Sequence, residues 1–124
     1  MTSKDSTTLR VIGSLREIAR ADWDACANPT SPAEAAGSEA DAWETEYNPF
    51  LSHDFLWSLE EAGCATRKTG WLGQHLVLDG GDGRPAAVLP AYVKSHSMGE
   101  YVFDQGWADA FERAGGQYYP KLQV

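Results

Sequence analysis

The sequence predicts one domain of the α/β or α+β class, and three observations support this prediction. The chain has 124 residues, a length that suits a single core. Apolar residues make up 43% of the chain and five residues are Trp, which is enough for a packed interior. Helical and strand-like patterns follow one another in the order β, α, α, β, β, β, α, β, with short turns between adjacent strands.

The N-terminal half predicts one strand and two helices. Residues 1–8 are polar and predict a disordered tail, and residues 9–13 predict a short strand. Ser14 followed by Glu17 is the pattern of a capping box, which predicts that the first helix begins there. A second helix is predicted over residues 52–63, because a serine that can act as N-cap precedes apolar residues at helical spacing and a glycine closes the segment.

Residues 28–47 have a different composition. Pro, Ser, Ala, Gly and acidic residues dominate this segment, so it predicts an acidic loop insertion between the two helices. A loop of this length is either a mobile surface segment or a functional one, such as a lid or a partner-binding loop. The sequence leaves both readings open.

The C-terminal half predicts a hairpin, a further strand and a helix, with an extended segment at the end. Residues 75–78 and 85–93 predict strands, and Gly80-Gly81-Asp82-Gly83 between them predicts a turn. This run is not a phosphate loop, since such a loop ends in Lys and Ser or Thr and is followed by a helix. Residues 100–103 predict the next strand and residues 107–114 the last helix.

Charge and composition exclude several classes of protein. Ten basic residues against eighteen acidic ones give a net charge of -8, which argues against DNA or RNA as a partner because phosphate binding needs a basic patch. No apolar run approaches the roughly 20 residues of a membrane span, and no signal peptide pattern is visible. We therefore expect a cytoplasmic protein. The two cysteines and three histidines lack ligand spacing, so we expect no metal site.

The side chains with the widest chemical capability lie close together around Gly99. His96 and Glu100 are residue types that act as general bases, and Lys94 can hold a phosphate or carboxylate. The alternative is that they are solvated loop residues, with Lys94 and Glu100 paired across the turn. A Ser-His-Asp triad that uses the serine on either side of His96 is disfavoured, because adjacent residues on an extended chain point to opposite faces.

The same region carries a family resemblance. The run Lys94-Ser95-His96-Ser97-Met98-Gly99-Glu100-Tyr101-Val102-Phe103-Asp104, together with Asn48-Pro49-Phe50-Leu51-Ser52-His53 and Tyr118-Tyr119-Pro120-Lys121-Leu122, resembles the N-terminal part of the FemAB-like predicted N-acyltransferases. These are bacterial proteins that are often labelled peptidoglycan biosynthesis or recognition proteins. The resemblance covers most of residues 48–124 and, more loosely, residues 9–27.

This resemblance implies a partial GNAT-like fold, with a mixed or antiparallel sheet and flanking helices. It also implies acyl or aminoacyl transfer to an amine acceptor, from acyl-CoA or aminoacyl-tRNA as donor. His96 and Glu100 are then the candidate catalytic residues, which would deprotonate the acceptor. Lys94, Tyr101 and Asp104 are the candidate substrate-binding residues, because they lie in the matching motif.

Members of that family are longer than this chain. The half of a GNAT unit that usually holds the CoA pyrophosphate at a helix N-terminus has no counterpart in the sequence. We therefore expect an N-terminal fragment that binds no cofactor and is inactive alone, with the missing C-terminal part of the same fold or a second copy as partner. The alternative is a non-catalytic binding or assembly module that docks a second lobe or a partner chain.

Overall fold

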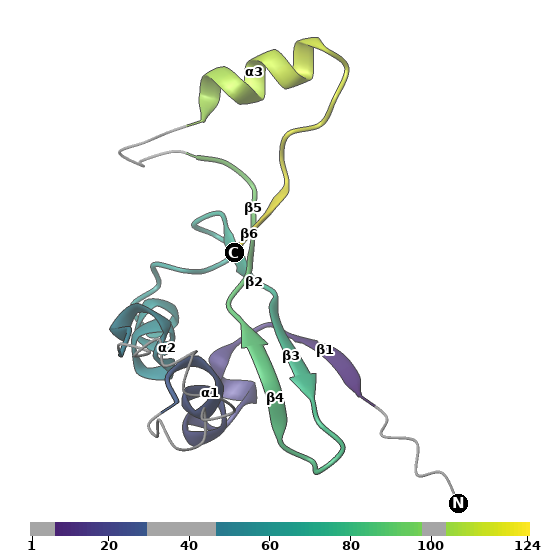
Figure 1. Ribbon diagram of the computed structural model, residues 1–124. Coiled ribbons are helices and arrows are strands. Elements are labelled where there is room, and N and C mark those ends of the chain that lie inside the picture. The colour runs from purple at the N-terminus through teal and green to yellow at the C-terminus, as the bar shows by residue number, and fades with distance from the viewer. Residues whose placement is uncertain (1–6, 30–46, 98–103) are drawn as a thin grey trace, which may run out of the picture.

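The structure is a computed structural model that describes residues 7–29, 47–97 and 104–124. Within these residues the chain forms two small antiparallel sheets and three α-helices, which confirms the α+β class (Figure 1). The predicted tail at residues 1–8 and the predicted acidic insertion at residues 28–47 fall almost entirely outside the described residues. None of the described helices is long and apolar enough to cross a membrane.

The first sheet has the strand order β1–β3–β4, and its neighbouring strands are antiparallel. Its strands are β1 (Thr8–Ile12), β3 (His75–Asp79) and β4 (Pro85–Leu89). The β1–β3 register places Ile12 opposite His75. β3 and β4 form the predicted hairpin, so the glycine-rich run between them is a turn.

The predicted first helix is two elements, because the chain leaves helical geometry at Ile18 and Ala19. Ser14 caps the 3-10 helix η1 (Leu15–Glu17) through the predicted capping box. Ile18 and Ala19 then have extended backbone angles, and α1 (Arg20–Ala27) begins after them. The prediction of one continuous helix is therefore wrong. The break allows the Ile18 side chain to enter the core, where 7% of the residue is exposed.

The second helix begins where the sequence predicts. α2 (His53–Glu61) has Ser52 as its N-cap, and the Ser52 hydroxyl oxygen accepts the backbone N–H of Phe55 at 3.2 Å. A short 3-10 helix, η2 (Pro49–Leu51), leads into it. In the fold, α1 packs on β4 and contacts α2, so both helices lie on the same side of the first sheet.

The hydrophobic core lies between the first sheet and these helices. Its buried apolar side chains come from β1, η1, α1, α2 and β3, and they are Ile12, Leu15, Ile18, Trp23, Leu56 and Val77. Leu15, Trp23 and Val77 are fully buried. Because these residues are far apart in the sequence, the core fixes η1 and α2 against the sheet and so positions the polar groups that these elements carry.

The second sheet has the order β2–β5–β6 and lies between the first sheet and α3 in Figure 1. Its strands are β2 (Trp71–Gly73), β5 (Tyr92–Lys94) and β6 (Lys121–Gln123). The predicted return strand over residues 85–93 is divided between the two sheets. Pro90 lies at the division, because it has no N–H to donate to a sheet. A single strand over this range is therefore wrong.

The last helix, α3 (Gln105–Arg113), stands apart from α1 and α2 in Figure 1. Asp104 occupies its N-cap position, and Gly115 follows it with a φ of 92°, in the left-handed region that glycine adopts at helix ends. This confirms the helix predicted over residues 107–114. The strand predicted over residues 100–103 lies outside the described residues.

The backbones of Gly73 and Gly13 approach each other closely, and this contact allows a prediction about stability. A Cβ added at Gly73 would lie 2.5 Å from the carbonyl oxygen of Gly13 and 3.3 Å from His75 Nε2. We expect Gly73→Ala to lower the free energy of unfolding by about 1–3 kcal/mol, since backbone must move to admit the methyl group. Urea unfolding would measure this loss. Gly106→Ala is the control, because an added Cβ there meets no atom within 4 Å, and equal losses in both variants would contradict the assignment.

Candidate functional site

A cluster of hydrogen-bonded side chains lies where the segment after β5, the start of α3 and the start of β6 meet. We call it the Asp104 network, and its members are Ser97, Asp104, Tyr118, Tyr119 and Lys121. Two of these residues, Ser97 and Asp104, lie on either side of the stretch that holds Glu100 and Tyr101. The network therefore connects residues that lie on both sides of Glu100 and Tyr101 in the motif over residues 94–104.

Asp104 is the centre of this network. Its carboxylate accepts the hydroxyl of Tyr118 at 2.8 Å, and it also accepts the hydroxyl of Tyr119 and the ammonium of Lys121. The Lys121 ammonium, followed by the hydroxyls of Ser97 and Tyr119, holds the pKa of the Asp104 carboxyl well below its usual range. A carboxylate held so firmly in its charged form is a poor proton acceptor. The geometry favours a positioning role for Asp104, which fixes Tyr119 and Lys121.

Lys94 is buried, with 2% of the residue exposed. Its ammonium lies 4.4 Å from the centre of the Trp71 ring and 3.3 Å from Ser97 Oγ. Ser97 Oγ in turn lies 2.6 Å from the hydroxyl oxygen of Tyr119. Lys94 and Asp104 are thus connected through two hydroxyl groups. The buried Lys94 ammonium polarises the Ser97 hydroxyl. It has little contact with solvent.

His96 lines a pocket of about 230 Å³ beside the network. Ser97 and Tyr119 also line this pocket, and α3 contributes Gln105, Ala108, Asp109 and Glu112. These four positions follow the i, i+3, i+4, i+7 spacing of one helix face. The fold therefore places the imidazole of His96 in one pocket with the carboxylates of Asp109 and Glu112.

Gly70 provides the space that His96 occupies. The backbone of Gly70 has a φ of 86°, and a Cβ added there would lie 2.7 Å from His96 Nε2. The amide of Ser95 also donates to the carbonyl of Gly70 at 3.1 Å, which fastens the chain next to His96. Both observations indicate that a glycine at this position sets where the imidazole lies.

The structure brings together three of the five residues singled out from the sequence. Lys94 and Asp104 are linked, and His96 lies beside them. Glu100 and Tyr101 lie outside the described residues, so their roles stay predictions. The residues missed in the sequence are Asp109, Glu112, Tyr119 and Lys121. The helical spacing of the acidic pair was a usable signal, but only with knowledge of which face of α3 meets the pocket.

We expect Asp104→Asn to loosen the start of α3 and of β6, because Lys121 and two tyrosines lose their charged acceptor. The low pKa sets the pH range of this effect. The contribution of Asp104 is present above the ordinary carboxyl pKa and is lost only as the pH falls through the lower folded-state value. Faster amide hydrogen exchange in β6 of Asp104→Asn at neutral pH would support this prediction. Asp82→Asn, in the β3–β4 turn, is the control and should leave the exchange unchanged. Unchanged exchange in Asp104→Asn would refute the prediction.

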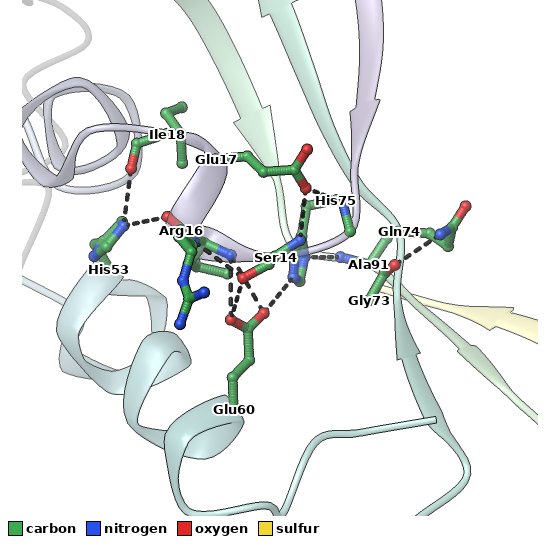
Figure 2. Close-up of polar contacts among 12 residues, drawn as sticks. Ser14, Arg16, Glu17, Ile18, His53, Glu60, Gly73, Gln74, His75 and Ala91 are labelled. Carbon is green, nitrogen blue, oxygen red and sulfur yellow. Dashed lines mark hydrogen bonds and ion pairs between the residues drawn. The ribbon is translucent and has the colours of Figure 1, made fainter. Parts of the chain in front are cut away.

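A second polar cluster lies at the edge of the core, around Glu60 of α2. Figure 2 shows Glu60 extending towards Ser14 and His75. Its carboxylate accepts the Ser14 hydroxyl at 2.8 Å and the Leu15 N–H at 3.3 Å, and His75 Nε2 lies 3.7 Å from Glu60 Oε1. The serine bonds to the carboxylate and not to the imidazole, so this cluster is not a nucleophilic triad. No local pattern in the sequence indicates this cluster, because its members are far apart in the chain.

His75 is fully buried, and its Nδ1 accepts the backbone N–H of Ala91 at 3.1 Å. In the neutral ring the proton therefore lies on Nε2, which faces Glu60. Burial lowers the pKa of His75, and the nearby charge of Glu60 opposes this shift without reversing it. The imidazole is neutral at neutral pH.

This burial predicts a loss of stability in mild acid. A histidine with a lowered folded-state pKa contributes stability above its unfolded pKa of about 6.5, and that stability falls as the pH drops towards the folded value. We expect the free energy of unfolding to decline from pH 7.5 to pH 5 by up to about 1.4 kcal/mol for each unit by which the pKa is lowered. Urea unfolding at several pH values would measure it. His75→Gln should flatten the slope, and equal slopes in the variant and the unaltered chain would contradict the prediction.

The fold and the pocket define an α+β protein with a histidine and two carboxylates facing a common space, next to a fixed network of hydroxyl and ammonium groups. The FemAB-like family, described as peptidoglycan biosynthesis/recognition, matches residues 14–124. The chain therefore belongs to the FemAB-like family. Membership of this family supports a general function as a transferase connected with peptidoglycan biosynthesis. No curated protein and no solved structure matched the chain, so the GNAT-like fold stays a prediction.

Proposed function

We propose that this chain takes part in the transfer of an acyl or aminoacyl group to an amine, and that the pocket beside the Asp104 network receives the amine. One observation carries the proposal: His96 shares this pocket with Asp109 and Glu112. Amines are cationic at neutral pH, so two carboxylates on the α3 face attract them. An ammonium group must lose a proton before its nitrogen can attack an acyl carbon. Histidine is the side chain best suited to accept that proton at neutral pH.

The reaction then follows from the roles of these groups. His96 takes a proton from the ammonium, and the freed nitrogen attacks the acyl carbon of the donor. The new C–N bond replaces the bond to the donor's leaving atom, which is sulfur in acyl-CoA or oxygen in aminoacyl-tRNA. That atom leaves with the second proton that the attacking nitrogen loses, while His96 keeps the first. The hydroxyls of Ser97 and Tyr119, held by Lys94 and Asp104, line the pocket and so fix the wall beside which the amine and the acyl carbon meet. Glu100 is the alternative base, and Tyr101 a further candidate for substrate binding.

The acidic face of α3 gives the test. The assay uses the chain together with the C-terminal part of the fold that we expect it to need, and the same applies to every kcat and KM given below. The probes are acetyl-CoA and alanyl-tRNA as donors and a short peptide with a free lysine amine as acceptor. We expect the double variant Asp109→Asn, Glu112→Gln to raise the KM for the amine by about tenfold or more, with a smaller effect on kcat, since it removes attraction before the chemical step. Asp82→Asn, in the β3–β4 turn, is the matched control. An unchanged KM in the double variant would show that the acceptor binds elsewhere.

Self-association is the second candidate, and a separate observation favours it. On α3, Trp107 is 77% exposed and Phe111 is 50% exposed, one helical turn apart and away from the acidic face. A second copy of the chain would cover this apolar surface, as in an assembly module. Sedimentation velocity over a range of concentrations tests this. We expect Trp107→Ser to abolish any dimer, and a wild-type chain that stays monomeric throughout would remove the candidate.

A further inference from the structure

The first sheet has an apolar face on the side away from the described helices that pack on it. α1 and α2 lie on the side where Ile12 and Val77 enter the core, and the second sheet separates α3 from this sheet in Figure 1. Because side chains alternate along a strand, the register assigns every second residue of each strand to the opposite side. We call that side the open face, and its residues are Leu9, Val11, Leu76, Leu78, Ala87 and Leu89.

Every position of the open face is apolar, although much of it is in contact with solvent. Leu9 is 60% exposed, Val11 54% and Leu89 41%. An antiparallel sheet with one face on the core and the other in water usually carries polar residues at the outward positions. Aliphatic residues in all three strands, at every outward position, indicate instead a face that another element covers.

The size of the open face limits what can cover it. Six side chains exposed to this degree present on the order of 400 Å² of apolar surface, which is the size of the patches that mark interaction sites. A stable contact between two folded chains needs about 800 Å² on each partner. The open face alone is therefore too small to hold a second copy of the chain. Three strands, spaced about 4.8 Å apart, instead match an α-helix, which is about 10 Å across with its side chains.

Charge decides the other side of such a helix. None of the six residues of the open face is charged, so the surface that lies against them must be apolar too. The chain as a whole is acidic, with eighteen Asp and Glu against ten Lys and Arg and a net charge of -8. This field attracts a segment whose solvent side is basic and repels one whose solvent side is acidic.

We propose that the open face is the docking surface for a basic amphipathic α-helix of another protein. The apolar stripe of the helix, with residues at i, i+3, i+4 and i+7, lies on the aliphatic side chains of the three strands. Its basic side chains point away from the sheet. The proposal uses no residue of the proposed transfer reaction. Failure of helix docking would leave the role of His96 intact, and failure of acyl transfer would leave this surface intact.

The test is a titration of the whole chain into a fluorescent peptide, followed by anisotropy. The probe is an N-acetylated helix of about 14 residues, or roughly four turns, with Leu at helical spacing and Arg elsewhere. Arginine is chosen because it brings no amine to the pocket of His96. One comparison peptide has the same residues in an order that does not gather Leu on one side, and another has Glu in place of Arg.

We expect saturable binding of the basic amphipathic peptide and at least about tenfold weaker binding of both comparison peptides. Backbone amide signals of β1, β3 and β4 should shift in NMR as the peptide binds. Equal binding of the reordered peptide would mean that charge alone attracts it, and equal binding of the acidic peptide would refute the choice of a basic helix. The absence of saturable binding would also overturn the proposal.

Two leucines of equal exposure locate the binding. Leu9→Lys should weaken peptide binding about tenfold or more, because it places a charge under the apolar stripe. Leu122→Lys is the control, because Leu122 is 59% exposed but lies on β6 of the second sheet, and it should change the affinity by less than about twofold. Equal weakening in both variants would show that the helix does not dock on the open face.

Far-UV circular dichroism would report whether Leu9→Lys is folded, and Val11→Lys is a second variant on the same strand with the same expected loss. The double variant Asp109→Asn, Glu112→Gln should bind the peptide as the unaltered chain does, because these residues line the pocket of His96. A loss of binding there would place the peptide in that pocket. A dimer that Leu9→Lys separates in sedimentation would mean that a second copy covers the open face, which would also overturn the proposal.

Discussion

Replacing Trp23 by alanine is expected to lower the free energy of unfolding by about 3–5 kcal/mol. Trp23 is fully buried in the centre of the core, between the first sheet and α2. Its indole N–H donates to the carbonyl of Leu51 at 2.9 Å, and its ring meets the ring of His75 edge-on at 5.9 Å. The substitution therefore leaves a cavity, an unsatisfied carbonyl and a loosened His75. Domains of this size are stable by only about 5–15 kcal/mol, so one substitution removes a large part of the total.

Trp107 provides the matched control, because it is also a tryptophan but is 77% exposed. At a protein concentration where the chain is monomeric, we expect Trp107→Ala to change the free energy of unfolding by less than about 0.5 kcal/mol. Urea unfolding of both variants, followed by far-UV circular dichroism, would measure the difference. Equal losses of unfolding free energy in the two variants would mean that Trp23 does not lie in the core. A larger loss for Trp107 would place an important packing surface on α3.

Short-range sequence patterns correctly predicted the elements whose formation depends on neighbouring residues. The capping box at Ser14, the N-cap at Ser52 and the turn between β3 and β4 all depend on residues within a few positions of each other. The break at Ile18 depends on a distant residue. His53 Nε2 donates to the carbonyl of Leu15 at 2.7 Å and contacts the carbonyl of Ile18 at 3.1 Å, which takes these carbonyls out of a regular helix.

The second sheet was harder to predict for the same reason. β2 has only three residues, and its partners in β5 lie 19 to 23 positions away in the chain. A short strand carries too little periodicity to be told from a polar link, and its pairing is decided by the fold. Pro90 is a local signal for a sheet edge or a bulge, but it does not predict that the chain crosses to another sheet.

For the candidate site, the sequence singled out one motif, and its roles stay predictions; the burial and partners of its side chains could not be predicted. Lys94, His96 and Asp104 were visible because capable residue types gather in one motif. Their burial and partners depend on Tyr119 and Lys121, which come from β6 and the segment before it. Lys94 thus turned out to be buried against Trp71, and Asp104 to be fixed by a lysine that is seventeen residues away.

His96 is where the proposed function makes its strongest claim. If His96 accepts the proton of the amine, His96→Gln should lower kcat by about 10²–10⁴-fold, the usual contribution of a general base, with a smaller change in the KM for the amine. Glutamine keeps much of the size and polarity of the side chain, so the fold should persist. Ser95→Ala is the control, because Ser95 is the exposed neighbour that does not line the pocket.

Two further variants separate the catalytic role of His96 from the alternatives. Gly70→Ala places a methyl group 2.7 Å from the original position of His96 Nε2, so it should lower kcat by displacing the imidazole without removing it. In that variant the imidazole is still present, so its residual kcat should exceed that of His96→Gln. If His96→Gln retains full activity and Glu100→Gln loses it, the base is Glu100. If both variants retain full activity, neither residue accepts the proton, and the pocket beside the Asp104 network only binds the amine.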